Sequence, residues 1–235
     1  KMKIALLGYG KMGKTIEHLV KRRGHSIVFK SSSERAIGDV SEADVAIDFS
    51  TPEAAAENIK SCFKLGIPVV SGTTGWLDRY NEIIKFCKDS NGSFIYASNF
   101  SIGVNLFFNL NEQLAEIMSP WDQYKVSIEE IHHIEKKDAP SGTAISLAEG
   151  IMQHINKTGW KLKNATEEEI EIIAKRIDKV NGVHEVVYKS DIDSISIKHE
   201  SHNREGFAIG AILASEWLQP KKGVFTMKDV LGLSK

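Results

Sequence analysis

The chain has 235 residues, 42% hydrophobic and 26% charged, which is the composition of a globular protein with one large or two modest domains. Its 30 basic and 31 acidic residues give a net charge of −1, so nothing in the charge predicts binding to nucleic acid or to an anionic membrane. No apolar run reaches the length of about 18 residues that a transmembrane helix needs. Cys62 and Cys87 lie far apart without disulfide or zinc spacing. We therefore expect a soluble, cytoplasmic protein.

A glycine-rich turn stands near the start of the chain. A short apolar run at residues 4–7 predicts a strand covered on both faces. GYGKMG (residues 8–13) follows, and KTIEHLVKRRG then has helical spacing and ends at Gly24. Strand, GxGxxG and helix in this order are typical of a dinucleotide-binding fingerprint, with the phosphates at the helix N-terminus. Such turns also occur for structural reasons alone, but the flanking strand and helix favour cofactor binding.

Strands and helices continue to alternate up to about residue 103. Further strands are predicted at residues 26–29, 44–49, 67–70 and 93–97. Helices are predicted from an N-cap at Ser50 or Thr51 to a stop at Gly66, and over residues 77–89. Repeated units of this kind predict an α/β fold with a Rossmann-type, doubly wound parallel sheet. Because ligands of such sheets bind at the carboxyl ends of strands, GTTG and ASNF are candidates for the nicotinamide side of the site.

The pattern changes after about Gly103. We predict helices over residues 104–118, 144–155 and 166–177, the last with Thr166 as its N-cap, and strands over residues 124–131, 183–189 and 195–199. Strands and helices grouped in this way predict a second, α+β domain. Residues 207–218 are apolar nearly all round, which predicts a buried helix that is a candidate to return to the first domain.

The segment EEIHHIEKKDAPSGTA, residues 129–144, combines two kinds of chemical group. Its histidines, lysines and an aspartate stand at the end of a predicted strand. Its PSGT part supplies N–H groups and hydroxyls at a helix start, which can hold a carboxylate or a phosphate. An anion bound there would lie beside acid–base groups, as a catalytic site requires. The alternative is a solvated charged loop followed by an ordinary helix cap.

The pattern E-x-H-H-x-x-K-x-D-A-P-S-G-T-A resembles the signature of the bacterial dihydrodipicolinate reductases, also called 4-hydroxy-tetrahydrodipicolinate reductases. GYGKMG, GTTG, ASNFSIGVN and GVFTMKDVLGL also fall where that family has them, so the resemblance spans the chain. It implies a dinucleotide-binding domain over residues 1–103, completed by residues 206–235, and a substrate-binding and oligomerisation domain over residues 104–205 that forms a homotetramer. It also implies hydride transfer from NADH or NADPH to a cyclic imine with two carboxylates, in lysine and diaminopimelate biosynthesis.

The resemblance also implies roles for individual residues. His132 matches the acid–base histidine of the family and Lys136 its proton-donating lysine. The matches to its substrate contacts are His133, Ser141, Gly142 and Thr143. The matches to its cofactor contacts are Gly8, Tyr9, Gly10, Lys11, Met12, Gly13, Gly72, Thr73, Thr74, Ala97, Ser98, Asn99 and Phe100. No metal is expected.

The chain departs from typical family members after the second predicted strand, where it is shorter. No acidic residue is evident at the strand end, where one would accept the ribose hydroxyls of NAD. Lys30, the serines at residues 31–33 and Arg35 can instead donate to a 2′-phosphate, which predicts that NADPH is used at least as well as NADH. The alternative is that Glu34 is the ribose acceptor.

Three other functions are alternatives. A metalloenzyme would use the histidines His132, His133, His199 and His202. No HExxH spacing occurs, however, and adjacent histidines on a strand point to opposite faces. A regulatory nucleotide-binding protein would not need the lysine and PSGT groups. A semialdehyde dehydrogenase would need a nucleophilic cysteine, whereas Cys62 and Cys87 lie in helical patterns. His184 and His199 are expected to be packed sheet residues. Arg204 is expected either to face the site or to be a solvated residue that only caps the following helix.

Overall fold

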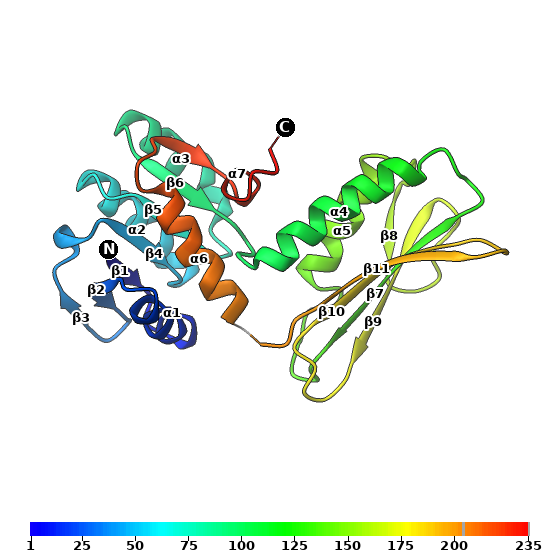
Figure 1. Ribbon diagram of the computed structural model, residues 1–235, viewed down its shortest axis with the longest axis horizontal. Helices are drawn as coiled ribbons and strands as arrows, with labels where there is room; N and C mark the ends of the chain where they lie inside the picture. Colours follow the sequence, from blue (N-terminus) through cyan, green and yellow to red (C-terminus); the bar gives the residue numbers. More distant parts are fainter. Residues whose placement is uncertain (204, 235) are drawn as a thin grey trace. The chain divides into compact units, whose positions relative to one another are not determined.

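The protein is described by a computed structural model, which covers residues 1–203 and 205–234. The chain forms two compact units (Figure 1). Unit 1 consists of residues 1–102 together with the chain from Glu205 on, and unit 2 of the chain from Gly103 to Asn203. Arg204 lies outside the described residues. Among the described residues, no helix is both long and apolar enough to cross a membrane.

Unit 1 is built on a seven-stranded sheet. Its strands are β1 (Lys3–Leu7), β2 (Ser26–Ser31), β3 (Ala36–Gly38), β4 (Val45–Asp48), β5 (Val69–Ser71), β6 (Ser93–Tyr96) and β12 (Gly223–Phe225). They are ordered β12-β6-β5-β4-β1-β2-β3, and all pair in parallel except the edge strand β3, which is antiparallel to β2. Every residue of β4 is buried, as expected for a strand with helices on both faces. The prediction of a Rossmann-type sheet is confirmed.

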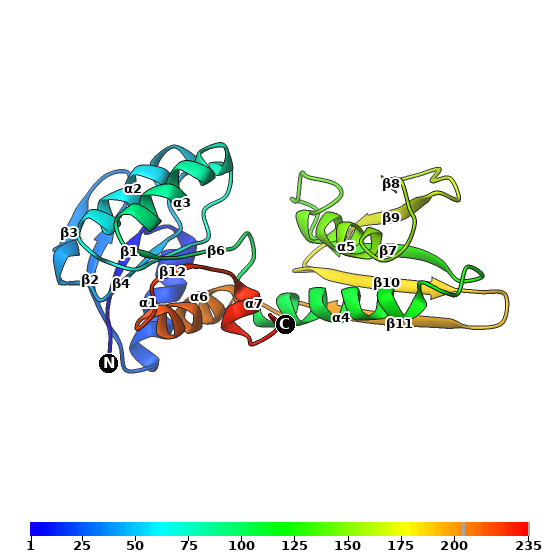
Figure 2. The same cartoon turned by 90° about the horizontal axis from the view of Figure 1, so that it is seen from above.

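Helices cover both faces of this sheet (Figure 2). One face packs against α1 (Lys11–Arg22), α6 (Glu205–Leu218) and α7 (Met227–Val230), and the other against α2 (Pro52–Lys64) and α3 (Tyr80–Asp89). In α1 the buried residues Ile16, Leu19 and Val20 follow helical spacing, so one stripe faces the sheet. The apolar segment at residues 207–218 is α6, which packs in unit 1 although it follows unit 2 in the chain.

Unit 2 is built on a five-stranded mixed sheet. Its strands are β7 (Lys125–His132), β8 (Gly159–Lys161), β9 (Glu169–Arg176), β10 (Val183–Lys189) and β11 (Ser194–Glu200). In the order β11-β10-β7-β9-β8, the central β7 pairs antiparallel with β10 and parallel with β9. Helices α4 (Ile102–Met118) and α5 (Gly142–Met152) share one hydrophobic core with this sheet. The prediction of a second α+β domain is confirmed.

The predicted helix over residues 166–177 is wrong, because residues 169–176 form strand β9. Ile170 and Ile172 alternate with charged residues and are fully buried, which is the period of a strand rather than of a helix. Thr166 does make a helix-start contact: its N–H and hydroxyl donate to Glu169 Oε2 at 2.9 and 3.0 Å. That turn precedes a strand because β7 offers a parallel partner.

Several short elements were not predicted. They are the edge strands β3, β8 and β12, the helix α7, and two single 3₁₀ turns at Val40–Glu42 and Leu77–Arg79. The second of these turns occupies the start of the predicted helix over residues 77–89, so that α3 begins at Tyr80. Strands of three residues carry too little periodicity to be recognised, because their hydrogen bonds come from a neighbouring strand.

Candidate active site

The core-facing side of β7 becomes polar at its carboxyl end. Val126, Ile128, Glu130 and His132 alternate along the strand and are all buried. Side chains two residues apart lie on the same face of a strand, so Glu130 and His132 are neighbours in the interior of unit 2. A buried carboxylate and a buried imidazole need polar partners, because burial without them is costly.

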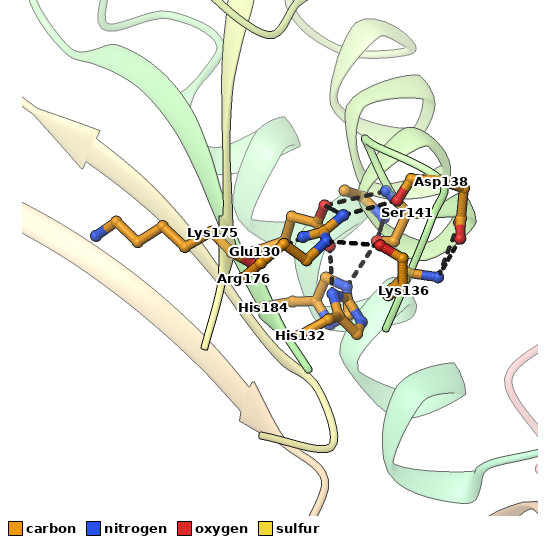
Figure 3. Close-up of polar contacts among 9 residues, drawn as sticks. Glu130, His132, Lys136, Asp138, Ser141, Lys175, Arg176 and His184 are labelled. Carbon is orange, nitrogen blue, oxygen red and sulfur yellow. Dashed lines mark hydrogen bonds and ion pairs between the residues drawn. The ribbon is translucent and has the colours of Figure 1, made fainter. Parts of the chain in front are cut away.

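Glu130 is the centre of these contacts (Figure 3). Its Oε1 accepts hydrogen bonds from Arg176 Nη2 at 3.1 Å and from the Ser141 N–H at 3.2 Å. Its Oε2 lies 2.5 Å from His132 Nδ1, an ion-pair distance, although the directions are not those of an ordinary hydrogen bond. Burial raises the pKa of Glu130, but His132, Ser141 and Arg176 together outweigh it and hold that pKa at about 2. Glu130 is therefore a buried carboxylate at neutral pH.

His184 faces the same cluster from β10. It is paired in register with Glu130, and its ring lies 5.0 Å from the ring of His132. Its Nε2 lies 3.0 Å from Ser141 Oγ. Burial, together with His132, lowers the pKa of His184 to about 3. The prediction of a packed sheet residue is confirmed, because the side chain is 5% exposed; it also contacts the candidate site.

Arg176 holds the loop that follows β7. Besides Glu130, it donates through Nη2 to the carbonyl of Asp138 at 2.7 Å and through Nε to the carbonyl of Lys136 at 3.3 Å. The Lys136 ammonium lies 2.9 and 2.8 Å from the two carboxylate oxygens of Asp138 (Figure 3). The hydrogen bond from Lys136 lowers the pKa of Asp138. The lysine is thus held beside the cluster by a local ion pair and a fixed backbone.

The start of α5 supplies the predicted anion-binding groups. Ser141 is the N-cap, and its Oγ accepts from the Ala144 N–H at 3.2 Å. Ser141 is 3% exposed, and its N–H and hydroxyl are both used by the protein, for Glu130 and for His184. Gly142 is exposed and Thr143 half-buried. Two of the three predicted groups at this helix start are therefore accessible to a ligand.

Glu130, His132 and His184 have donor atoms that lie within 4.8 Å of one another, which is the spacing of a candidate metal site. Two ligands of a tetrahedral zinc ion lie about 3.3 Å apart, whereas Glu130 Oε2 and His132 Nδ1 are 2.5 Å apart. The Arg176 guanidinium already shares the same carboxylate. This geometry fits an acid–base cluster better than a metal site. The predicted alternative set of four histidines is not among the clusters of the described residues.

The glycine-rich turn of unit 1 fits a dinucleotide. Gly8 has φ +95°, and a Cβ there would be 2.1 Å from the carbonyl oxygen of Phe49. A Cβ at Gly13 would be 2.5 Å from the Gly8 carbonyl oxygen, so the helix packs directly on the turn. Gly10 is the N-cap of α1 without a side-chain cap, and a Cβ there would meet nothing within 4 Å. The helix N-terminus is therefore open to a pyrophosphate.

The other predicted cofactor segments follow β5 and β6, at the same edge of the parallel sheet. Thr74 and Ser98 are exposed, and Gly72, Ala97 and Asn99 are partly exposed. Around the glycine-rich turn, Lys11 is exposed, and Tyr9 and Met12 are half-buried. Thr73 and Phe100 are instead packed inside, with 5% and 1% exposed. The three segments thus converge at one edge of the sheet.

A buried aspartate that the sequence did not single out joins two of these loops. Asp48, at the end of β4, accepts hydrogen bonds from the hydroxyls of Ser50, Ser71 and Thr73 at 2.6, 2.8 and 2.9 Å. Burial raises the pKa of Asp48 despite these bonds. The Thr73 hydroxyl in turn accepts from the Ser50 N–H at 2.9 Å. The network fixes the GTTG segment onto the end of β4.

Unit 2 brings together His132, Lys136 and Ser141, as expected from the sequence. His133 follows them half-buried, and its Nδ1 has no hydrogen-bond partner within the described chain. Arg176 and the contacts of Glu130 were missed. The alternation of Val126, Ile128, Glu130 and His132 was the signal for Glu130, whereas Arg176 stood in a segment predicted as a helix.

The two cysteines do not supply a nucleophile. Cys62 and Cys87 are both free and buried. Burial raises the pKa of Cys62 to about 12 and that of Cys87 to about 11. A thiol that stays protonated at neutral pH is a poor nucleophile, so the alternative of a semialdehyde dehydrogenase loses its support.

Comparison with known proteins places the chain in a family. The family models described as "Dihydrodipicolinate reductase, N-terminus" and "Dihydrodipicolinate reductase, C-terminus" match residues 2–100 and 103–231. A relative from Christiangramia forsetii, named 4-hydroxy-tetrahydrodipicolinate reductase, is 56% identical over 233 residues, 98% of each chain. A relative of the same name from Rickettsia rickettsii is 38% identical, covering 94% of this chain and 95% of its own.

A solved structure has the same fold. It is titled as the dipicolinate-bound dihydrodipicolinate reductase from Paenisporosarcina sp. TG-14, and it aligns with a TM-score of 0.74 at 22% identity, covering 96% of this chain and 97% of that one. An amine dehydrogenase from Mycobacterium smegmatis aligns with a TM-score of 0.62 at 9% identity, over 97% and 95% of the two chains. With both family models and close relatives spanning nearly its whole length, the chain belongs to the dihydrodipicolinate reductase family.

Proposed function

We propose that this chain reduces 4-hydroxy-tetrahydrodipicolinate to tetrahydrodipicolinate by hydride transfer from NADH or NADPH. The observation that carries the proposal is the 56% identity, over 98% of both chains, to a relative named for this reaction. The chain is an NAD(P)H-dependent oxidoreductase of lysine and diaminopimelate biosynthesis. The acid–base cluster on β7 and the open glycine-rich turn of unit 1 supply the chemistry that such a reaction needs.

When bound, NAD(P)H supplies the hydride. Reduction of a conjugated imine builds negative charge toward nitrogen, and a nearby cation stabilises and then neutralises that charge. Lys136 is the proposed proton donor, because its ammonium is held beside the cluster by Asp138 and a fixed backbone. His132 is the proposed acid–base histidine, paired with a buried carboxylate. His133 is a proposed substrate contact.

The proposed substrate is a cyclic dicarboxylate. Support comes from the solved structure of the same fold, whose title states that it binds dipicolinate. Here, Gly142 and Thr143 stand accessible in the first turn of α5, where backbone N–H groups and the helix dipole favour a carboxylate. Ser141 supports this helix start through its contacts with Glu130 and His184, and contributes to substrate binding by holding the turn.

The proposed cofactor site is the glycine-rich edge of unit 1, and we propose that NADPH is used at least as well as NADH. Lys30 ends near this edge on β2, with its ammonium 4.5 Å from the centre of the Tyr9 ring. Glu17, on α1, pairs with Lys30 at 3.4 Å and accepts from the Tyr9 hydroxyl. A cation at this strand end favours a 2′-phosphate over bare ribose hydroxyls.

Three further properties are proposed from the family. Residues 1–103, completed by residues 206–235, would bind the dinucleotide, and residues 104–205 would bind substrate and form the subunit contacts. Support comes from the division into units after Ile102 and at Glu205. The protein is proposed to be a cytoplasmic homotetramer. Ile173, on β9, is 37% exposed, and it lies opposite Glu129 on the face of the sheet that points away from the core of unit 2, where a second copy could cover it.

A coupled assay tests the activity. The purified chain is mixed with the upstream synthase, its substrates and NADPH or NADH, and the loss of nicotinamide absorbance is followed in the near ultraviolet. We expect oxidation of the cofactor only when both enzymes are present. No oxidation with either cofactor, from protein shown to be folded, would contradict the proposal. Added chelator should leave the rate unchanged, and loss of activity with chelator would revive the metalloenzyme alternative.

A further inference from the structure

We propose that Glu130 is a positioning residue for His132: its buried carboxylate fixes a proton on Nδ1 of the imidazole and thereby makes Nε2 the atom that exchanges protons with the substrate. This role is part of the proposed reaction. It rests on that reaction only for the exchange of the proton with the substrate. The state of the imidazole itself follows from contacts within unit 2.

Glu130 Oε2 and His132 Nδ1 lie 2.5 Å apart. An ionised carboxylate is an acceptor only, and two lone pairs cannot face each other at that distance. Because Glu130 is ionised at neutral pH, the proton that allows the two atoms to approach this closely belongs to Nδ1. Glu130 has no solvent exposure and His132 only 8%, so water does not weaken the pair as it would on the surface.

The other oxygen of the Glu130 carboxylate is held by two donors. Oε1 accepts a hydrogen bond from Arg176 Nη2, on the neighbouring strand β9, and another from the Ser141 N–H, at the start of α5. These two donors fix the orientation of the carboxylate, so that Oε2 can only point to His132 (Figure 3). The arrangement resembles the carboxylate–imidazole pairs in which a buried acid sets the tautomer of a catalytic histidine.

At the other side of the His132 ring, Gly182 lies against Nε2, and a Cβ there would be 3.2 Å from that atom. The absence of a side chain at residue 182 thus leaves room at Nε2, whereas Nδ1 is enclosed. The ionisable groups around His132 are Glu130 on its own strand, His184 on β10, Arg176 on β9, and Lys136 and Asp138 on the loop after β7.

The substitution Glu130→Gln tests the inference. Arg176 and Ser141 both donate to Oε1, so the carbonyl oxygen of the new amide would take that position and its NH₂ group would face Nδ1. Nδ1 would then have to accept, which moves the proton of the neutral ring to Nε2 and disfavours the doubly protonated ring. Glu129→Gln is the matched control, because Glu129 is on the same strand but pairs with Lys175 outside the cluster.

Two measurements follow. In ¹H–¹⁵N spectra of the ring, assigned with His132→Gln, we expect the wild-type protein and Glu129→Gln to carry the proton on Nδ1, and Glu130→Gln to carry it on Nε2. In the reductase assay, the pH profile of kcat/KM should differ between Glu130→Gln and the wild type, and Glu130→Asp should restore part of the wild-type profile.

The outcome is decided by the spectra, which need no substrate. An unchanged tautomer in folded Glu130→Gln would overturn the inference. If that variant does not fold, the wild-type spectrum decides alone, and a neutral ring protonated on Nε2 would overturn the inference equally. If the expected spectra are found but the wild-type protein oxidises neither cofactor, the proposed function fails and the inference about His132 stands.

Discussion

Lys136 is exposed enough to meet a ligand and ordered enough to act on one. Its side chain is 22% exposed and ion-paired with Asp138, and the carbonyl of its backbone is held by Arg176. An ordered cation is what a developing negative charge requires, because its position costs no reorganisation during the reaction. The neighbouring Lys137 is exposed, which makes it a matched control for the following prediction.

Lys136→Ala should lower kcat by about 10²-fold or more, the usual scale for the loss of a proton donor. Lys137→Ala should leave kcat within about twofold of the wild type, because that side chain lies outside the contacts that hold Lys136. The measurement is steady-state kinetics with the substrate generated by the upstream enzyme. A Lys136→Ala variant with near-normal kcat and only a raised KM would assign the lysine to binding instead. His132→Ala should act in the same direction but less severely.

Thr143→Val tests the anion-binding start of α5. The change removes a hydroxyl and keeps the shape, so it should raise KM for the substrate by the equivalent of about 1–3 kcal/mol, as expected for a hydrogen bond to a charged group. KM for the cofactor should not change. Ser146→Ala, on an exposed position of the same helix, is the control. If KM for the cofactor rises and KM for the substrate does not, α5 holds the nucleotide.

Lys30 is the residue expected to decide the cofactor. Its ammonium is shared between Glu17 and the face of Tyr9, so a 2′-phosphate would compete with Glu17 for it. Lys30→Ala should therefore raise KM for NADPH by about tenfold, which is about 1.4 kcal/mol, and change KM for NADH little. The comparison is kcat/KM for the two cofactors. A strong preference for NADH that Glu34→Ala abolishes would show instead that Glu34 accepts the ribose.

At the scale of elements, three strands of unit 2 assemble the cluster. β7 contributes Glu130 and His132, the antiparallel β10 places His184 opposite Glu130, and the parallel β9 places Arg176 opposite His132. Register alone brings these side chains together, because a shift by one residue would turn each strand's set to the other face. The pairing of the three strands thus forms the cluster, and the cluster in turn orders the loop after β7.

His184 should make the protein less stable in acid. Its pKa is lowered to about 3 in the folded protein, whereas an unfolded histidine titrates near pH ~6.5. Between these values the unfolded chain binds the additional proton, so stability falls as pH decreases from about 6.5 to about 3, by up to about 1.4 kcal/mol per pH unit. His184→Gln should flatten this part of the curve, measured as melting temperature against pH.

The control for this effect is His154→Gln, which replaces an exposed histidine of the same unit. It should leave the pH dependence of the melting temperature as it is in the wild-type protein. Glu130 adds to acid sensitivity at lower pH, since a carboxylate with a lowered pKa loses its stabilising effect as pH falls from about 4.5 toward 2. An unchanged curve for His184→Gln between pH ~6.5 and ~3 would mean that His184 is not buried neutral.

At the scale of the whole chain, unit 1 is completed by residues that follow unit 2. Ala208, Ala211, Ile212 and Leu218 of α6 are fully buried in the core formed by α1 and the first sheet. Strand β12 then adds to the edge of that sheet beside β6. Unit 1 therefore depends on the C-terminal segment for its stability, because hydrophobic burial is the main source of folding free energy.

Gly210→Ala should destabilise unit 1, contrary to the usual effect in a helix. Alanine in place of glycine normally stabilises a helix by about 1 kcal/mol, but a Cβ at Gly210 would be 1.7 Å from the carbonyl oxygen of Phe100. Forced repacking costs about 1–3 kcal/mol or more, so the melting temperature should fall by several degrees. Gly206→Ala is the control, since its Cβ would be 3.5 Å from Ser101 Oγ. Equal melting temperatures for the two variants would contradict this close approach.

The sequence alone determined the parts of this protein that depend on local order. The apolar runs within β1 and β4, the GYGKMG turn between strand and helix, and the PSGT helix start each carry their own signal within a few residues. These signals gave the Rossmann-type sheet, the second domain and the family, and they named His132 and Lys136 for chemistry. Residues that are neighbours in the chain were enough for these predictions, because turns and caps use hydrogen bonds within a few positions of the chain.

Only the tertiary structure decided how distant residues meet. Thr166 and Glu169 form the contact of a helix start, yet β9 follows, because β7 provides hydrogen bonds and a buried face for Ile170 and Ile172. Arg176 reaches Glu130 across 46 positions, and His184 lies opposite it in the antiparallel register. Such contacts depend on strand pairing between remote segments, which no local pattern of charge or hydrophobicity encodes.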